Sequence, residues 1–212
     1  MVTKAIILAR GGSKRIPGKN LLHLKGQPLL SFVVAAAKAC SHIQETWVST
    51  NCPKIKEVAI CLGCKVLDRP DSLSSDTSQS EEALLHFVEN VDCDRVVFIQ
   101  PTSPLLTAGD LDKGFALLQE GYGSAFSVRV DHWEPKWTSS TTPDGWDVSD
   151  RPRSQDVEVS YIENGAFYIT SKDLLETTKS RYGGKRGMVE MPTYRSFQID
   201  TEEDLVLMEK LL

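Results

Sequence analysis

The sequence lacks the features of a disulfide-stapled, membrane-spanning or nucleic-acid-coating protein. Its five cysteines are an odd number without framework spacing and fit a reducing compartment better than disulfides. No apolar run approaches the roughly 20 residues needed to span a membrane, and Met1 leads directly into a predicted strand without a signal peptide. The formal net charge of −5 argues against broad binding to nucleic acid. We therefore expect a cytoplasmic protein that binds neither a membrane nor nucleic acid.

Several catalytic signatures are also absent. The four histidines have no H-x-x-x-H spacing, and no G-x-S-x-G elbow marks a nucleophile. Neither a P-loop, G-x-x-x-x-G-K-[ST], nor a G-x-G-x-x-G motif follows the first predicted strand. Cys61 and Cys64 form a C-x-x-C without a second ligand pair, which we interpret as a helix end with Gly63 as its cap.

The sequence does contain a basic, glycine-rich stretch at residues 8–20 (LARGGSKRIPGKN), directly after a predicted buried strand at 5–8. Glycines let backbone N–H groups approach an anion closely. Arginine forks bind phosphate in bidentate fashion, and lysines add movable point charges. The stretch therefore predicts a triphosphate site, although such a Gly-Gly pair is also typical of a solvated turn. Its glycines and cations are Gly11, Gly12, Gly18, Arg10, Lys14, Arg15 and Lys19.

Predicted strands and helices alternate along most of the chain. Strands are expected at residues 5–8, 45–50, 64–67, 95–100, 124–130, 166–170 and 187–191, and helices at 28–40, 53–62, 76–91, 106–120, 172–179 and 201–212. This alternation predicts one α/β domain, residues 1–212, with a Rossmann-like, doubly wound and mostly parallel sheet. Ligands of such sheets bind outside the carboxyl ends of the strands. Arg10, Arg69 and Gln100 all fall there.

Residues 131–160 interrupt this pattern with Trp133, Trp137 and Trp146, several prolines and few aliphatic residues. Three tryptophans seldom lie in free solvent, and aromatic residues together with proline and arginine suit an interface. We therefore predict an inserted arm at a subunit interface.

Three polar segments accompany the predicted strands. Residues 69–80 (RPDSLSSDTSQS) carry hydroxyls that can read a base and a ribose, but Asp76 or Thr77 can equally cap a helix. Residues 100–105 (QPTSPL) place prolines on both sides of Thr-Ser, which fixes a rigid turn and presents Gln100 at the sheet edge. Residues 198–204 (QIDTEED) begin the last helix, with Thr201 and Asp204 as a capping box.

Together these strings resemble the CMP-sialic acid synthetases, or acylneuraminate cytidylyltransferases. The likeness runs from Ala5 to about Leu205 through LARGGSKRIPGKN, RPDSLSSDTSQS, FIQPTSPL, RPRSQD, ENGAFY and QIDTEED. It implies an enzyme that joins CTP to a nine-carbon 2-keto sugar acid and releases pyrophosphate, with Mg²⁺ as cofactor. It also implies a homodimer or a dimer of dimers in which the arm reaches a neighbouring subunit's active site.

The resemblance also assigns residues. It implies catalytic roles for Arg10, Lys19 and Arg153, and it makes Asp200 a ligand of Mg²⁺. The implied substrate-binding residues are Gly11, Lys14, Asn20, Arg69, Ser78, Ser80 and Gln100. Two positions depart from the family: Gln198 stands where the first Asp of D-x-D is usual, and Ser154 where a second Arg is common.

Three alternatives stay open. CMP could be transferred to a legionaminic, pseudaminic or Kdo-type acid instead. A sugar-1-phosphate nucleotidyltransferase would share the fold, but RPRSQD and ENGAFY argue against it. The loss of charged partners at Gln198 and Ser154 also allows a degenerate module that binds CTP without turnover.

Overall fold

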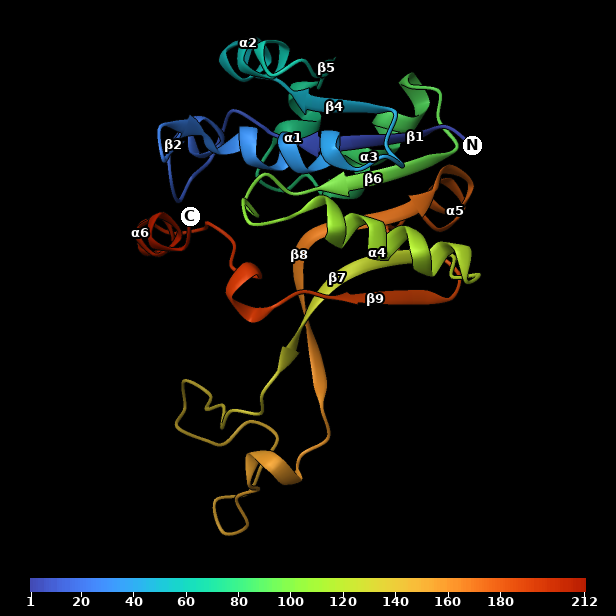
Figure 1. The fold of residues 1–212 in the computed structure, drawn as a ribbon. Helices are drawn as coiled ribbons and strands as arrows, with labels where there is room; N and C mark the ends of the chain where they lie inside the picture. The colour runs from blue at the N-terminus through green and yellow to red at the C-terminus, as the bar shows by residue number, and fades with distance from the viewer.

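The computed structural model describes residues 1–212 and centres on one seven-stranded sheet (Figure 1). Its strands are β1 (Thr3–Leu8), β4 (Glu45–Thr50), β5 (Lys65–Asp68), β6 (Arg95–Ile99), β7 (Ser124–Asp131), β8 (Ser160–Ser171) and β9 (Arg186–Glu190). They lie in the order β5-β4-β1-β6-β8-β7-β9. Only β8 runs antiparallel to its neighbours. The predicted α/β, doubly wound and mostly parallel sheet is confirmed.

Helices cover both faces of this sheet. They are α1 (Leu29–Ala39), α2 (Pro53–Cys61), α3 (Ser80–Asn90), α4 (Ala108–Gln119), α5 (Lys172–Thr178) and α6 (Glu202–Leu211). A short hairpin of β2 (His23–Leu24) and β3 (Gln27–Pro28) precedes α1. In Figure 1, α1 and α4 lie in front of the sheet. None of the helices combines the length and the apolar character that crossing a membrane would require.

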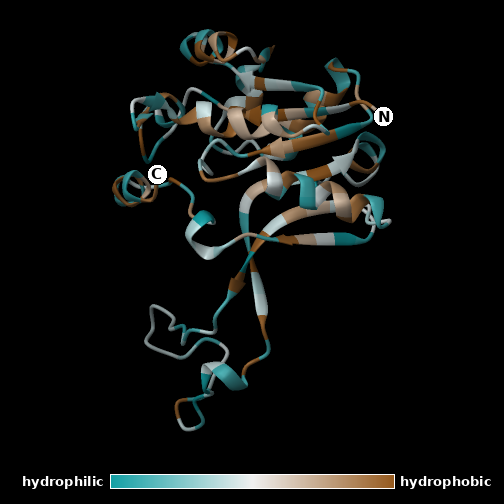
Figure 2. Cartoon of the chain, in the orientation of Figure 1, coloured by the Kyte–Doolittle hydropathy of each residue, from teal (hydrophilic) through white to brown (hydrophobic).

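Successive side chains of the central strands point to opposite faces of the sheet and belong to two separate apolar clusters. Ile7 of β1 and Val97 of β6 belong to a cluster of 24 buried residues under α1, α2 and α4. Ile6 and Val96 point to the opposite face, into a cluster of 10 buried residues that includes Leu84 and its neighbours on α3. Both faces of the central strands are therefore dry, as the continuous apolar runs of the sequence predict. Figure 2 shows this as brown strands at the centre of the fold.

A third, smaller cluster ties distant parts of the chain together at one end of the sheet. Ile16 from the basic loop packs with Leu24, Leu29, Ile199 and Met208. All five side chains are at most 5% exposed. This cluster anchors the glycine-rich loop against the segment that precedes α6, so two stretches far apart in sequence meet beside one cavity.

Two predicted element starts are wrong by more than two residues, each for an identifiable reason. The helix expected from Asp76 begins only at Ser80, because Gln79 and Glu82 form the capping box and neither Asp76 nor Thr77 caps it. The strand expected at 166–170 starts earlier, at Ser160, because β8 continues along β7 past a register shift between Phe126 and Val128. Other expected ends are confirmed: Thr201 and Asp204 cap α6, and Gly63 follows α2 with φ of 69°.

The inserted arm connects the outer ends of β7 and β8. Figure 1 shows it projecting from the sheet beyond β9. Its tryptophans form a cluster of their own, since Trp146 meets Trp133 and Trp137 edge-on at ring-centroid distances of 6.4 and 5.0 Å. Trp137 is still 54% exposed. Figure 2 shows mostly polar and neutral colours along the rest of the arm.

An ion pair fixes the segment that leads into α6. Arg195 donates from both terminal nitrogens to Asp110 of α4, with Nη2 lying 2.9 Å from Oδ1. The Asp110 side chain is 1% exposed and also accepts hydrogen bonds from the N–H and hydroxyl of Thr107. Burial alone would raise the pKa of Asp110, but the bonds from Arg195 and Thr107 prevail and hold it below its ordinary value.

We expect Asp110→Asn to lower the free energy of unfolding by about 3 kcal/mol, because the partly buried Arg195 loses the buried carboxylate that it pairs with. Since the folded pKa lies below the unfolded one, the wild-type contribution is present above the ordinary value of 3.8 and is lost as pH falls through the folded pKa. Denaturant titrations at pH 7 and pH 3 measure both effects. Glu120→Gln, on the exposed end of α4, is the control and should change stability by less than about 0.5 kcal/mol. Equal loss in both variants would contradict this account.

Candidate functional site

A cavity of about 550 Å³ opens at the carboxyl ends of β1 and β6. The strand order reverses here, because the chain places β4 and β5 on one side of β1 and β6 on the other. Ligands of open α/β sheets bind at such a switch point. Only 2 of the 16 lining residues are hydrophobic, so the cavity suits a polar or charged ligand.

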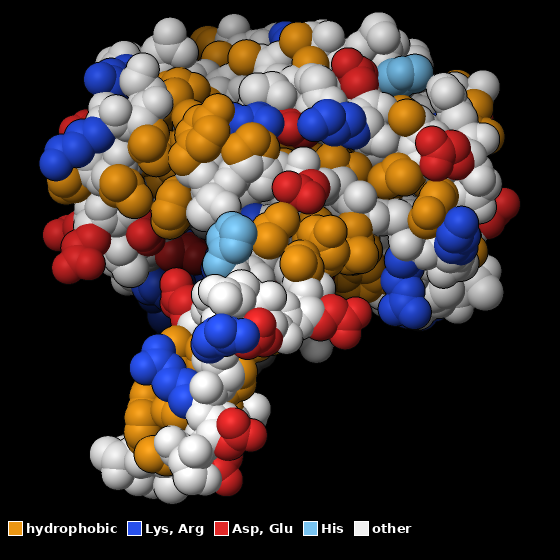
Figure 3. Space-filling model, turned by 60° about the horizontal axis from the view of Figure 1, so that its bottom comes forward, with side chains coloured by type: hydrophobic (Ala, Val, Ile, Leu, Met, Phe, Trp, Pro, Cys, Tyr) orange, Lys and Arg blue, Asp and Glu red, His pale blue; other side chains and the backbone are white.

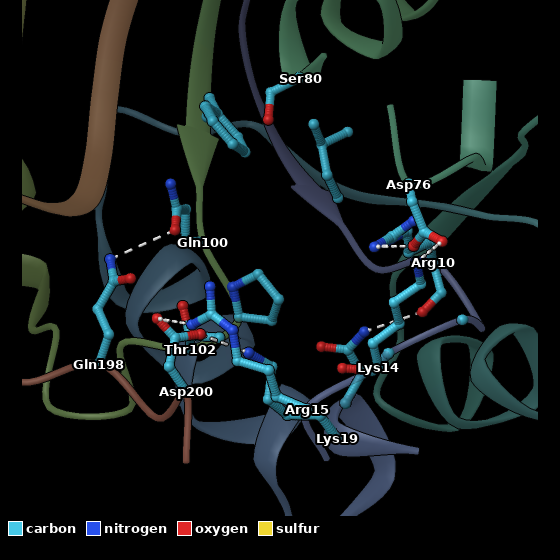
Figure 4. Close-up of a pocket in the computed structure, with 16 residues that line it drawn as sticks. Arg10, Lys14, Arg15, Lys19, Asp76, Ser80, Gln100, Thr102, Gln198 and Asp200 are labelled. Atoms are coloured by element: carbon cyan, nitrogen blue, oxygen red, sulfur yellow. Dashed lines mark hydrogen bonds and ion pairs between the residues drawn. The ribbon is translucent and has the colours of Figure 1, made fainter. Parts of the chain in front are cut away.

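Four cations of the first loop line this cavity and face two carboxylates. At one side, Asp76 accepts from Arg10 at 3.0 Å and from Lys14 at 2.7 Å. At the other side, Asp200 pairs with Lys19 at 2.8 Å and with the more distant Arg15 at 3.4 Å. Figure 4 shows these two groups on opposite sides of the cavity. Four cations against two carboxylates leave an excess of positive charge in the cavity. This excess favours a polyanionic ligand.

Backbone contacts hold these side chains in place. Arg10 also donates to the carbonyl oxygens of Ser74 and Ser75, at 3.2 and 2.8 Å, which binds the first loop to the segment before α3. Lys19 donates to the carbonyl oxygen of Ile199 at 3.0 Å. The hydrogen bond from Lys14, joined by that from Arg10, lowers the pKa of Asp76. Asp76 therefore stays a carboxylate, and it holds two cations ready at the cavity wall.

Several buried polar atoms at the cavity have no partner in the protein. Asn20 is 7% exposed and donates to the carbonyl oxygen of Arg10 at 3.2 Å, but its Oδ1 is unpaired. The hydroxyl of Thr102, in the rigid turn after β6, also lines the cavity and is buried and unpaired. Buried polar groups are normally hydrogen-bonded, so these atoms mark positions where a ligand or water is expected.

Gln100 and Gln198 form the wall between the two charged groups and β8. Gln198 donates from Nε2 to the carbonyl oxygen of Asn164 at 2.6 Å and to Gln100 Oε1 at 3.3 Å. Figure 4 shows the Gln198–Gln100 bond as a dashed line. Gly165 lies directly beside both amides with φ of 70°, a conformation that favours glycine.

Of the predicted site residues, the structure brings Arg10, Lys14, Lys19, Asn20, Ser80, Gln100 and Asp200 together around the cavity. Gly11 does not line it; its N–H donates to Asn51 Oδ1 at 3.0 Å, and an added Cβ would lie 2.9 Å from Cys52 Cβ. Ser78 also lies outside the lining and donates to Glu82 at 2.6 Å.

Arg69 lines a second hollow of about 480 Å³ at the carboxyl ends of β4 and β5. It is 8% exposed, yet its Nε and Nη2 have no hydrogen-bond partner. Burial, together with the nearby charge of Arg10, lowers the pKa of Arg69 to about 10. A buried guanidinium without a partner is costly, so a ligand group is the natural partner for this side chain.

Arg153 lies far from these residues along the chain, in the inserted arm. It pairs with Asp156 at 2.6 Å and lines a separate hollow with Trp133, Pro135 and Arg151. Figure 3 shows Lys and Arg side chains beside hydrophobic ones on this arm. Within one chain, Arg153 does not line the cavity beside β1 and β6.

Two further residues that line the cavity, Asp76 and Thr102, received no ligand-binding role from the sequence. Arg15 was counted only among the cations of the predicted triphosphate site, and Gln198 only as a departure from the family pattern. Arg15 lies in LARGGSKRIPGKN and Thr102 in FIQPTSPL, and their position next to residues with assigned roles was a usable sign. Asp76 was interpreted as a helix cap. Asp76 follows β5 in a polar segment, and β5 ends at the same edge of the sheet as β1 and β6. This position could have indicated that Asp76 lies at the cavity.

Solved structures define the fold class. The CMP:2-keto-3-deoxy-manno-octonic acid synthetase, solved as a complex with CTP, superposes with a TM-score of 0.73 at 17% identity, over 100% of both chains. The 4-diphosphocytidyl-2C-methyl-D-erythritol synthase of Anaerococcus prevotii also has a TM-score of 0.73, at 13% identity over 99% of this chain and 95% of its own. At such identities, the likeness shows the α/β nucleotidyltransferase fold.

Sequence comparison then gives the family. The family model described as Cytidylyltransferase matches residues 4–211, and the chain belongs to the cytidylyltransferase family, as its resemblance to the acylneuraminate cytidylyltransferases predicts. N-acylneuraminate cytidylyltransferase A of Danio rerio is 37% identical over 97% of this chain, which spans 50% of that relative. CMP-N,N′-diacetyllegionaminic acid synthase of Legionella pneumophila is 31% identical over 98% of this chain and 95% of its own. The chain thus spans about half the length of the relatives from Danio rerio and Oncorhynchus mykiss and nearly all of the Legionella pneumophila synthase.

We expect Arg69→Met to stabilise the ligand-free protein by about 1–2 kcal/mol, because an apolar side chain of similar length replaces an unpaired buried cation. If CTP is the ligand, as the resemblance implies, the same change should weaken its binding by about tenfold or more, because the ligand would lose a charged partner. Denaturant titration and calorimetric CTP titration measure the two effects. Arg186→Met, on an exposed position of β9, should change neither. A destabilised Arg69→Met protein with unchanged CTP affinity would show that Arg69 has a purely structural role.

Proposed function

We propose that this protein transfers CMP from CTP to the anomeric hydroxyl of a nine-carbon 2-keto sugar acid of the sialic acid type and releases pyrophosphate. The observation that carries this proposal is the cavity at the switch point, where four cations from the first loop surround space for a triphosphate. Membership of the cytidylyltransferase family supports CTP as the donor. The named relatives that activate N-acylneuraminic or legionaminic acids support a sugar acid as the acceptor.

The chemistry requires positioning and charge neutralisation more than covalent catalysis. The sugar hydroxyl attacks the α-phosphorus in line and loses its proton to water, the bond from the α-phosphorus to the bridging oxygen breaks, and pyrophosphate leaves. Arg10, Lys14 and Lys19 offset the charge of the triphosphate and of the transition state. To reach the phosphates, these cations exchange the carboxylates of Asp76 and Asp200 for phosphate oxygens.

The nucleoside would be held by polar groups from two hollows, because Asn20 and Ser80 line the cavity and Arg69 lines the second hollow. Asn20 has a buried unpaired oxygen, and Arg69 has buried unpaired nitrogens, so both can form new hydrogen bonds without losing old ones. Ser80 lines the cavity at the first residue of α3, and Ser78 precedes it. We assign the base and ribose to these four residues.

Mg²⁺ fits the end of the cavity that holds Asp200. Mg²⁺ in nucleotide enzymes is usually held by one or two carboxylates, with substrate phosphates and water completing the shell. The chain has no group of three or more His, Cys, Asp or Glu that could hold a metal ion alone, so the triphosphate would supply most ligands. When bound, the ion neutralises charge on the phosphates. Asp200 then has to release Lys19 and Arg15.

A legionaminic-type acid is the second candidate acceptor, because the bacterial relative that activates such an acid matches this chain over 95% of its own length. Five free cysteines fit a reducing, cytoplasmic setting for either reaction.

Pyrophosphate release tests the proposed activity directly. We expect release with CTP, Mg²⁺ and one acid from a panel of N-acetylneuraminic, legionaminic, pseudaminic and Kdo acids, and no release when ATP, GTP or UTP replaces CTP. Release that depends on a sugar 1-phosphate would instead indicate a sugar-1-phosphate nucleotidyltransferase. If no acid in the panel gives pyrophosphate release while CTP still raises the melting temperature, the protein is a CTP-binding module without turnover.

We also propose a homodimer, or a dimer of dimers, in which each arm completes the cavity of its partner. Three features support this. Arg153 does not line the cavity of its own chain, the arm projects from the sheet, and Trp137, Val148 and Val159 of the arm are 54, 65 and 63% exposed. Aromatic residues and arginines are enriched at the centres of protein interfaces.

Subunit mixing tests this arrangement. Lys19→Ala and Arg153→Ala should each lose about 100-fold or more in turnover, because each removes a cation from the reacting phosphate. After co-refolding in equal amounts, about half of the dimers are mixed and each contains one intact site, so activity should return to about a quarter of wild type. If Arg153 acted within its own chain, the mixture would stay as inactive as its components.

A further inference from the structure

Gln198 occupies a position that faces the cavity on a segment that the fold holds firmly. Its neighbour Ile199 is fully buried and donates its N–H to the carbonyl oxygen of Thr102 at 2.9 Å. Ile199 packs into the apolar cluster with Leu24 and Met208, whereas Gln198 and Asp200 on either side of it are only partly buried and face the cavity. Both residues line it.

The orientation of the Gln198 amide follows from its hydrogen bonds. The carbonyl oxygen of Asn164 can only accept, so the Gln198 atom 2.6 Å from it is the amide nitrogen. The same nitrogen donates to Gln100 Oε1 at 3.3 Å. Gly165 leaves the space that this amide fills, since a Cβ there would collide with Gln198 Nε2. The backbone around β8 is therefore shaped to hold a neutral donor at this point.

A carboxylate would not make these contacts. Aspartate or glutamate at position 198 would set an ionised oxygen toward the carbonyl oxygen of Asn164 and toward Gln100 Oε1, and oxygen lone pairs without a proton between them repel. Such a group is favourable only with a cation between the oxygens. This wall of the cavity is therefore built around an amide, and the carboxylate at this end is Asp200 alone.

The paired amides leave one acceptor and one donor free. Figure 4 shows the Gln198 amide oxygen facing the interior of the cavity, while the Gln100 amide nitrogen points away from Gln198 on the side of Ser80. A neighbouring acceptor and donor match a ligand that carries a hydroxyl next to a carboxylate. The anomeric carbon of a 2-keto sugar acid carries both groups.

We propose that Gln198 is a substrate-binding residue that selects the sugar acid. It accepts a hydrogen bond from the anomeric hydroxyl and fixes Gln100 so that the Gln100 amide donates to the neighbouring carboxylate. An amide oxygen is not a base, so Gln198 takes no proton in the reaction and orients the attacking oxygen only. This role rests on the proposed cytidylyl transfer and separates Gln198 from Asp200, which faces the triphosphate.

Binding of each substrate alone tests this assignment. CTP with Mg²⁺ is titrated into the protein by calorimetry, and N-acetylneuraminic and legionaminic acids are then titrated into the protein saturated with a non-hydrolysable CTP analogue. We expect Gln198→Glu, which replaces the amide donor by a carboxylate of the same shape, to weaken acid binding about tenfold or more. The affinity for CTP should stay within about twofold. Asp200→Asn is the matched control and should show the reverse pattern.

Gln198→Met is a second variant that fills the space beside Gly165 without any hydrogen bond. It should lose acid binding as Gln198→Glu does, which separates a lost donor from an added charge or a misfolded segment. A weaker affinity for CTP with unchanged acid binding would make Gln198 a triphosphate or metal residue and overturn the inference. Unchanged binding of both substrates in both variants would also overturn it. If the wild-type protein turns over the acid and both variants bind the acid normally, the role of Gln198 is refuted but the proposed function stands. If the wild-type protein binds no acid, both the role of Gln198 and the proposed function are refuted.

Discussion

Like charges gathered at the carboxyl ends of β1 and β6 repel one another, and the organisation of the site depends on how that repulsion is offset. Four cations of one short loop line a single cavity in a chain whose net charge is −5. Asp76 and Asp200 offset them in two separate groups, one on each side of the cavity. Because each carboxylate serves two cations, the basic side chains are ordered and stay apart. A triphosphate would bring its own negative charge to the same place.

This arrangement depends on a segment that is distant in sequence. Asp200 comes from the chain just before α6, almost the whole length of the protein away from Lys19, which it pairs with at 2.8 Å. Burial of Ile199 and the ion pair between Arg195 and Asp110 hold that segment against the sheet. The position of the Asp200 carboxylate therefore depends on the burial of its neighbour Ile199. In this way the apolar core determines where the negative charge lies in the cavity.

The arm shows the opposite case, a segment whose charge has little to do with the core of its own chain. Arg153 pairs only with Asp156, three residues away, and the tryptophans of the arm pack on one another. The arm therefore forms its ion pair and its aromatic contacts within its own residues, and it still exposes apolar and cationic side chains. Its likeness to an interface was visible in sequence as tryptophan, proline and arginine without aliphatic periodicity. Its distance from the cavity was not.

Sequence alone determined the α/β alternation, the basic loop and the turn that presents Gln100, because these depend on local periodicity and on glycine and proline geometry. Only the tertiary structure showed that Asp76 pairs with Arg10 and Lys14 while Gln79 caps α3. It likewise showed that Gln198 bonds to Asn164 and Gln100, that Gly11 and Ser78 stand outside the cavity lining, and that Arg69 is buried without a partner. The physical reason is the same in each case. A polar side chain with several possible partners bonds to the one that lies nearest in space. Strand order and the packing of residues remote in the chain determine which partner that is.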